Sequence, residues 1–216
     1  MDLGLGNLAD VKGFVLPKSI VDTMYDSVLS IIAKGIAGRF ETYCNRKFGR
    51  VADDEVIFSA NRSTYVVPRY PLENVSAMEL RPTINDNWQD VLDTLIQIEE
   101  KSGLLYFGGA IGGDSMVLLR CTYTGGYWYE TLEPLDADGI ATVGYPSAMP
   151  DGAAPVPDDL KDAWLKQCLH EFELKDRLLP EGLANEASKS KTNWRLDQMV
   201  LMPEVENAIA QYRRFI

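Results

Sequence analysis

Histidine is the first side chain to examine for chemistry, and this 216-residue chain has one, His170. On a helical wheel His170 faces away from Leu165 and Cys168 and lies among charged residues. A general base needs a reacting partner and a group that orients it, and the sequence identifies neither. We therefore interpret His170 as a surface residue of a helix and predict no catalytic residue.

Adjacent carboxylates could supply acid–base chemistry, and the chain contains the pairs Glu99–Glu100 and Asp158–Asp159. Such pairs are common beside turns and at helix starts, and they predict catalysis only where geometry brings them together. A hydrolase that uses an acidic pair, one member with a raised pKa, remains an alternative hypothesis. We expect the chain not to be an enzyme.

Two further patterns resemble ligand sites, and both fail on spacing. Asp136 and Asp138 suggest part of a calcium loop, but Tyr145 falls where the loop needs a bidentate glutamate. The glycines of FGGAIGGDSM (107–116) lack the Lys-Ser/Thr and the helix N-terminus of a phosphate cradle. We assign these glycines to a hairpin turn and expect neither a metal nor a cofactor.

The three cysteines are odd in number, far apart and without a CxxC spacing. Each lies within an apolar periodic segment, which favours buried free thiols in a reducing compartment. The residues are Cys44, Cys121 and Cys168.

Aromatic and arginine side chains, which often anchor protein interfaces, form two groups in the sequence. We select them as candidate interface residues: Tyr127, Trp128, Tyr129, Trp194, Arg195, Tyr212, Arg213 and Arg214. For the first three, internal packing is the competing interpretation. For the C-terminal group, the alternative is a solvated helix whose arginines interact with the helix dipole.

Helices are predicted at both ends of the chain. Asn7 can cap a short first helix, and Ser19 a long one in which apolar residues recur every three or four positions from Ile20 to Cys44. Gly49 is its expected stop. A helix with a wide apolar sector follows from Asp158 or Asp159, and Pro203 opens a last helix.

The middle of the chain has the period of two that is typical of strands. Expected strands are Glu55–Phe58, Thr64–Val67, Val75–Arg81, Thr94–Glu99, Gly103–Phe107 and Met116–Tyr123. We predict an α+β fold in one domain, 1–216. Its helical core comprises 8–49 and 156–216, with an inserted antiparallel β-sheet over 51–129 and a long loop over 130–157.

The composition is that of an ordinary globular protein, with 46% hydrophobic and 25% charged residues. The net charge is −11, from 32 acidic and 21 basic residues. Such a surface repels phosphate, which argues against specific binding of nucleic acid.

The order of several short motifs resembles the head–tail connector (adaptor, or head-completion) proteins of tailed bacteriophages. The likeness rests on LADVKGFV with Leu8 and Lys12, ETYCNRKFG with Arg46 and Phe48, PRYPLENVSAMEL with Pro68, Tyr70 and Pro71, and then GLLYF, CTYTGGY, VPDDLKDAW and QYRRF. It covers most of the chain outside Asp136–Pro155. The connection after CTYTGGY and the segment between Leu179 and Met202 are longer than the family pattern.

This resemblance implies a structural virion protein without enzymatic activity or cofactor. It implies a homo-oligomeric ring beneath the portal protein that extends the DNA channel and presents a surface to the tail or a stopper protein. Genomic DNA would pass the lumen without specific binding, and the protein would lie in the virion neck after assembly in the host cytoplasm. We expect Gly125–Pro157 and Leu179–Met202 to contribute to ring contacts or portal docking.

Two other functions stay open from the sequence. A tail-completion protein of the same particle would share many of these features. A small-ligand or carbohydrate-binding β module would use Tyr127, Trp128 and Tyr129 to line a concave pocket.

Overall fold

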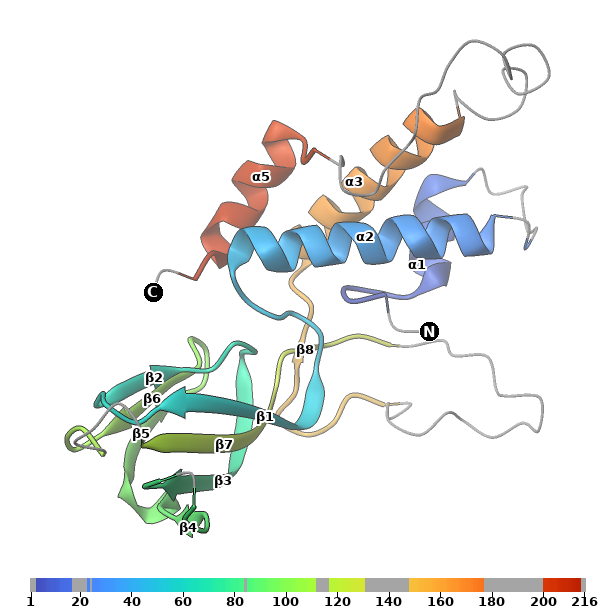
Figure 1. Ribbon diagram of the computed structural model, residues 1–216. Helices are drawn as coiled ribbons and strands as arrows, with labels where there is room; N and C mark the ends of the chain where they lie inside the picture. The colour runs from blue at the N-terminus through green and yellow to red at the C-terminus, as the bar shows by residue number, and fades with distance from the viewer. Residues whose placement is uncertain are drawn as a thin grey trace. The chain divides into compact units, whose positions relative to one another are not determined.

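The protein has an α+β fold, as the sequence predicts, and it divides into two compact units (Figure 1). The computed structural model describes residues 3–16, 23, 25–83, 85–111, 117–130, 148–176 and 200–214. The β unit consists of Arg46–Trp128 with Met149–Pro155, and the helical unit contains the α-helices.

Helix α1 (Leu8–Val15) begins with a capping box at Asn7, the residue expected to cap it. The Asn7 Oδ1 accepts from the Asp10 backbone N at 2.8 Å, and the Asp10 carboxylate accepts from the Asn7 backbone N at 3.3 Å. Two N–H groups that the first helical turn leaves unpaired are thereby satisfied.

Helix α2 (Asp26–Cys44) is shorter than predicted at both ends. It begins at Asp26, and Thr23 and Tyr25 before it are not helical. It ends at Asn45, which adopts the left-handed conformation with φ of 52°, so the expected stop at Gly49 is wrong. Asparagine tolerates this conformation because its short polar side chain bonds locally.

Helix α3 (Asp158–Asp176) is the centre of the helical unit and packs against α1, α2 and α5 (Pro203–Ile209). Asp158 and Asp159 lie in its first turn. Its Trp164 is fully buried, and the indole Nε1 donates to the Ala33 carbonyl of α2 at 3.1 Å. This single side chain therefore combines a large buried area with a hydrogen bond to a neighbouring helix.

Two residues of α3, Gln167 and Glu171, are buried although their side chains are polar. They lie beside the apolar sector of the helix. The Gln167 amide accepts from the Met202 backbone N at 2.9 Å and donates to the Val200 carbonyl at 3.1 Å. It also donates to Glu171 at 3.1 Å. Gln167 thus satisfies the backbone immediately before Pro203, where α5 starts as predicted.

The β unit contains two antiparallel sheets, with strand orders β1-β7-β3-β4 and β2-β6-β5. The strands are β1 (Val51–Ser59), β2 (Thr64–Val66), β3 (Leu72–Arg81), β4 (Gln89–Asp90), β5 (Leu95–Glu99), β6 (Leu104–Phe107) and β7 (Leu118–Gly125). A short parallel pair joins β8 (Tyr127–Trp128) to β9 (Ala154–Pro155). The six predicted strands all correspond to observed ones.

The two sheets pack on one shared core, which explains why core-facing and outward-facing residues alternate along their strands. On β7, Cys121 faces this core, and its register partners Val56 and Met78 also pack there. The neighbouring Arg120 points to the other face, where it forms an ion pair with Glu79 at 2.6 Å. A one-residue shift of register would exchange these two faces.

The predicted hairpin turn at FGGAIGGDSM is wrong. The strand before it, β6, pairs with β2 and β5, whereas the strand after it, β7, pairs with β1 and β3. The segment therefore carries the chain from one sheet to the other; residues 112–116 lie outside the described part of the chain.

Truncating Trp164 is expected to destabilise the helical unit. Trp164→Ala should lower the free energy of unfolding by about 3–5 kcal/mol because it opens a cavity. Trp164→Phe should lower it by about 1–3 kcal/mol, because it removes the bond to Ala33 and part of the buried ring. Urea unfolding followed by helical circular dichroism measures both. The exposed Lys34→Ala on α2 is the control, within about 0.5 kcal/mol of wild type; equal stability of W164A and this control would contradict the analysis.

Candidate interface sites

Arg46 lies among three aromatic rings of the β unit, one of which belongs to the candidate residue Tyr127, and only 5% of Arg46 is exposed. Its guanidinium carbon lies 3.4 Å from the ring centroid of Tyr70, 4.9 Å from that of Phe48 and 5.4 Å from that of Tyr127. The guanidinium also donates to the Tyr70 carbonyl. We name these four residues the Arg46 cluster; its rings and carbonyl oxygen stabilise the buried positive charge.

Backbone hydrogen bonds bring the three segments of the Arg46 cluster together. The Tyr127 N donates to the Phe48 carbonyl at 2.7 Å, and the Lys47 N to the Pro68 carbonyl at 2.8 Å. Gly126 has φ of +99°, and a Cβ there would lie 2.5 Å from the Gly49 carbonyl oxygen. Only glycine fits this close approach of two backbones.

The Arg46 cluster is built from three of the motifs on which the family resemblance rests. Arg46 and Phe48 come from ETYCNRKFG, Tyr70 from PRYPLENVSAMEL and Tyr127 from CTYTGGY. The motif residues are far apart in the chain, and they meet as packing partners. For Tyr127, a candidate interface residue, the structure thus shows internal packing, including a stacked contact with Phe48 at 6.5 Å.

Two ion pairs link residues near the start of β1 to residues near the start of β3. Arg50 forms two hydrogen bonds to the Glu73 carboxylate, at 2.6 and 2.8 Å. Arg69 Nε donates to Asp54 at 2.9 Å, and the Tyr123 hydroxyl donates to the same oxygen at 3.2 Å. Burial, together with the Asp54 charge, raises the pKa of Tyr123 above its ordinary value.

The other two aromatics of the first group fall into different units. Trp128 is half-buried in the β unit, where β8 pairs with β9. Tyr129 is 6% exposed in the helical unit, and its hydroxyl accepts from the Gly4 backbone N at 3.2 Å. Packing of Tyr127 and Tyr129 against their own units speaks against a ligand-binding platform formed by this aromatic run.

The C-terminal candidates Tyr212, Arg213 and Arg214 contact helices of their own unit. The Tyr212 hydroxyl donates to Asp159 of α3 at 2.6 Å, and the Arg214 backbone N donates to the Cys44 carbonyl at 2.8 Å. The Arg213 guanidinium lies 5.6 Å from the Tyr43 ring, and the residue is exposed. Trp194 and Arg195 lie outside the described residues. An interface role for all five stays a prediction.

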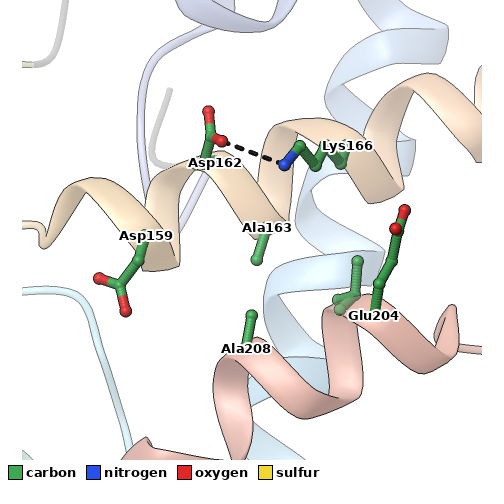
Figure 2. A pocket seen from close by; sticks show the side chains of 7 residues that line it. Asp159, Asp162, Ala163, Lys166, Glu204 and Ala208 are labelled. Atoms are coloured by element: carbon green, nitrogen blue, oxygen red, sulfur yellow. Dashed lines mark ion pairs between the residues drawn. The ribbon is translucent and has the colours of Figure 1, made fainter.

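A groove of about 180 Å³ lies between α3 and α5 (Figure 2). Its apolar lining is small: Ala163, Val205 and Ala208. Its charged lining consists of Asp159, Asp162, Lys166 and Glu204. Asp162 pairs with Lys166 at 3.3 Å, and Asp159 accepts from Gln211 and Tyr212, so contacts within the helical unit engage both aspartates.

The three thiols are buried and free, as the sequence predicts. Burial raises the pKa of the Cys121 thiol to about 12, and it also raises that of Cys168. His170 is half-buried on α3 rather than fully exposed.

Within the described ranges, no three or more histidine, cysteine, aspartate or glutamate side chains gather as metal ligands. None of the helices placed by the structure is both long enough and apolar enough for a bilayer span.

Arg46→Lys is expected to destabilise the β unit by about 2 kcal/mol, because a compact ammonium cannot stack on the rings as a planar guanidinium does. Thermal unfolding of the purified protein measures the change. Arg62→Lys at an exposed position is the matched control and should shift stability by less than about 0.5 kcal/mol. A loss no greater than that of R62K would show that the ring contacts contribute little.

The thiols should not react with a maleimide at pH 8 while the protein is folded. A pKa near 12 leaves a thiolate fraction of only about one in ten thousand, and burial blocks access as well. Mass spectrometry after labelling should show no adduct in the native protein and three in urea. Rapid native labelling of any cysteine would contradict the burial described above.

No known family model matches the sequence. No curated protein matches it either. The fold is similar to chains in solved structures of gene transfer agent (GTA) particles. A chain in the neck of the empty GTA particle, computed with C6 symmetry, superposes with a TM-score of 0.55 at 14% identity, covering 97% of this chain and 89% of that chain.

Two further matches have the same extent. For a chain of the virion of the native particle the TM-score is 0.53 at 13% identity, over 97% of this chain and 89% of that one. For a chain of the native neck computed with C12 symmetry it is 0.50 at 13% identity, over 97% and 88%. At these identities the comparison shows a shared fold.

Proposed function

We propose that this protein is a structural component of a phage-like virion neck, where it forms a ring-shaped head–tail connector beneath the portal. The observation that carries the proposal is the fold match over 97% of the chain to a chain from a GTA neck. A match of this extent includes both units, so it does not arise from one common motif.

The motif residues support the same proposal independently of that match. The order of ETYCNRKFG, PRYPLENVSAMEL and CTYTGGY in the sequence resembles that of the connector family. In the structure these motifs converge on the Arg46 cluster, which fixes how the β unit begins and ends. These motifs hold the beginning and the end of the inserted β unit together. Motifs with that role are suited to define a fold that several proteins share.

The function we propose is mechanical and needs no bond to be made or broken. The ring would extend the DNA channel of the portal and present a docking surface to the tail or a stopper protein. The net charge of −11 would keep DNA from adhering as it passes, because like charges repel along the channel wall. Assembly in the host cytoplasm, before the tail joins, belongs to the same proposal.

The proposal predicts that a discrete larger species appears when the protein meets the portal protein of the same particle. Mass photometry of each protein alone and of the mixture should show a new complex that contains several copies of this chain per portal ring. Electron microscopy should then show an added ring at one end of the portal. Surfaces that are exposed in the single chain would become buried in that ring.

An unrelated protein of similar charge and size is the control for non-specific binding to the portal. Absence of any complex, with folded protein and intact portal rings, would contradict the connector function. Binding to tail tubes instead of portal rings would assign the chain to tail completion.

A further inference from the structure

The β unit presents strand edges on two opposite sides. In one sheet the outermost strands are β1 and β4, and in the other they are β2 and β5. Residues 60–63 link β1 to β2, and residues 91–94 link β4 to β5. Because the two sheets share one core, these short links place β1 and β2 on one side and β4 and β5 on the other.

The β5 side carries an exposed apolar edge. Ile96 is 70% exposed and Ile98 is 37% exposed, although both lie in a strand with a neighbour on one side only. The Ile96 side chain is held over Gly108, where a Cβ would come within 3.0 Å of its Cδ1. Exposed β-branched residues on an edge strand favour contact with another chain.

The opposite side carries a hollow of about 250 Å³. It is lined by Phe58 and Tyr65, whose ring centroids are 5.2 Å apart, and by Ser59, Asn61 and Arg62. Two aromatic rings beside an open strand edge are suited to receive an aliphatic side chain.

The charges of the two sides are complementary. Arg62 lies exposed at the hollow, and Glu99 lies exposed at the end of β5 with its carboxylate accepting from Tyr106 at 3.3 Å. Opposite charges that border an apolar contact steer association and fix its orientation.

We propose that the β5 edge of one copy docks into the β1–β2 hollow of a second copy, with Ile96 on the Phe58 and Tyr65 rings and Glu99 near Arg62. Each copy then offers one edge and one hollow on opposite sides, as a head-to-tail contact requires for a ring. The proposal rests on ring formation in the proposed function and identifies the surfaces that form it.

Cysteine pairs test the direction of the contact. With Asn61→Cys and Gln97→Cys in one chain, mild oxidation should give a ladder of covalent dimers, trimers and larger species on a non-reducing gel. Each single variant should run as a monomer on that gel, because its cysteine meets no second cysteine across a head-to-tail contact. The three native thiols are buried, so we expect them to form no cross-links in this experiment.

Charge reversal tests the chemistry of the contact. Arg62→Glu or Glu99→Arg alone should weaken self-association about tenfold or more, and the double variant should recover most of the loss. Ile96→Lys should abolish ring formation, whereas Val200→Lys, at a 76% exposed position of the helical unit, should leave it intact. Circular dichroism verifies that each variant is folded.

The outcomes separate this inference from the proposed function. If I96K and both charge-reversal variants still form the rings that the wild type forms, the β5–hollow contact is overturned and the connector proposal stands. A covalent dimer from either single cysteine variant would also overturn it, since like edges would then meet. A wild-type chain that never associates, alone or with portal, would overturn both.

Discussion

Arg46 places a positive charge inside the β unit, and the charge can stay there only if other groups replace the water it has lost. In the described part of the chain those groups are the rings of Phe48, Tyr70 and Tyr127 and the Tyr70 carbonyl. Burying an unpaired charge is costly. The segments that supply these groups must therefore assemble together, which fixes where β1 starts, how the chain enters β3 and where it leaves the unit through β8.

The helical unit depends on the central helix α3 in a similar way. Trp164 and Gln167 each combine burial with hydrogen bonds to backbone groups that would otherwise be unpaired. Such bonds fix the orientation of one element against another more specifically than apolar contact does, because a shift of one residue would break them. The connector role proposed above would need this rigidity in both units.

Helices and strands were largely predictable because their apolar residues recur at the expected spacing. The capping of α1 by Asn7, the start of α5 at Pro203 and the six predicted strands followed from local signals. The sequence does not predict the stop of α2 at Asn45, since asparagine in the left-handed conformation has a weaker sequence signal than glycine. The hairpin between β6 and β7 was wrong because adjacency in sequence does not decide which strands pair.

The sequence by itself determined which residues are apolar, where the period changes from helix to strand, and the order of motifs that resembles the connector family. The tertiary structure alone decided what each buried face contacts. It made Tyr127, a candidate interface residue, a packing partner of Arg46, and it placed Ile96 and the Phe58–Tyr65 hollow on opposite sides of the β unit. Periodicity reports that a side chain is covered, whereas the identity of the cover depends on contacts between residues distant in the chain.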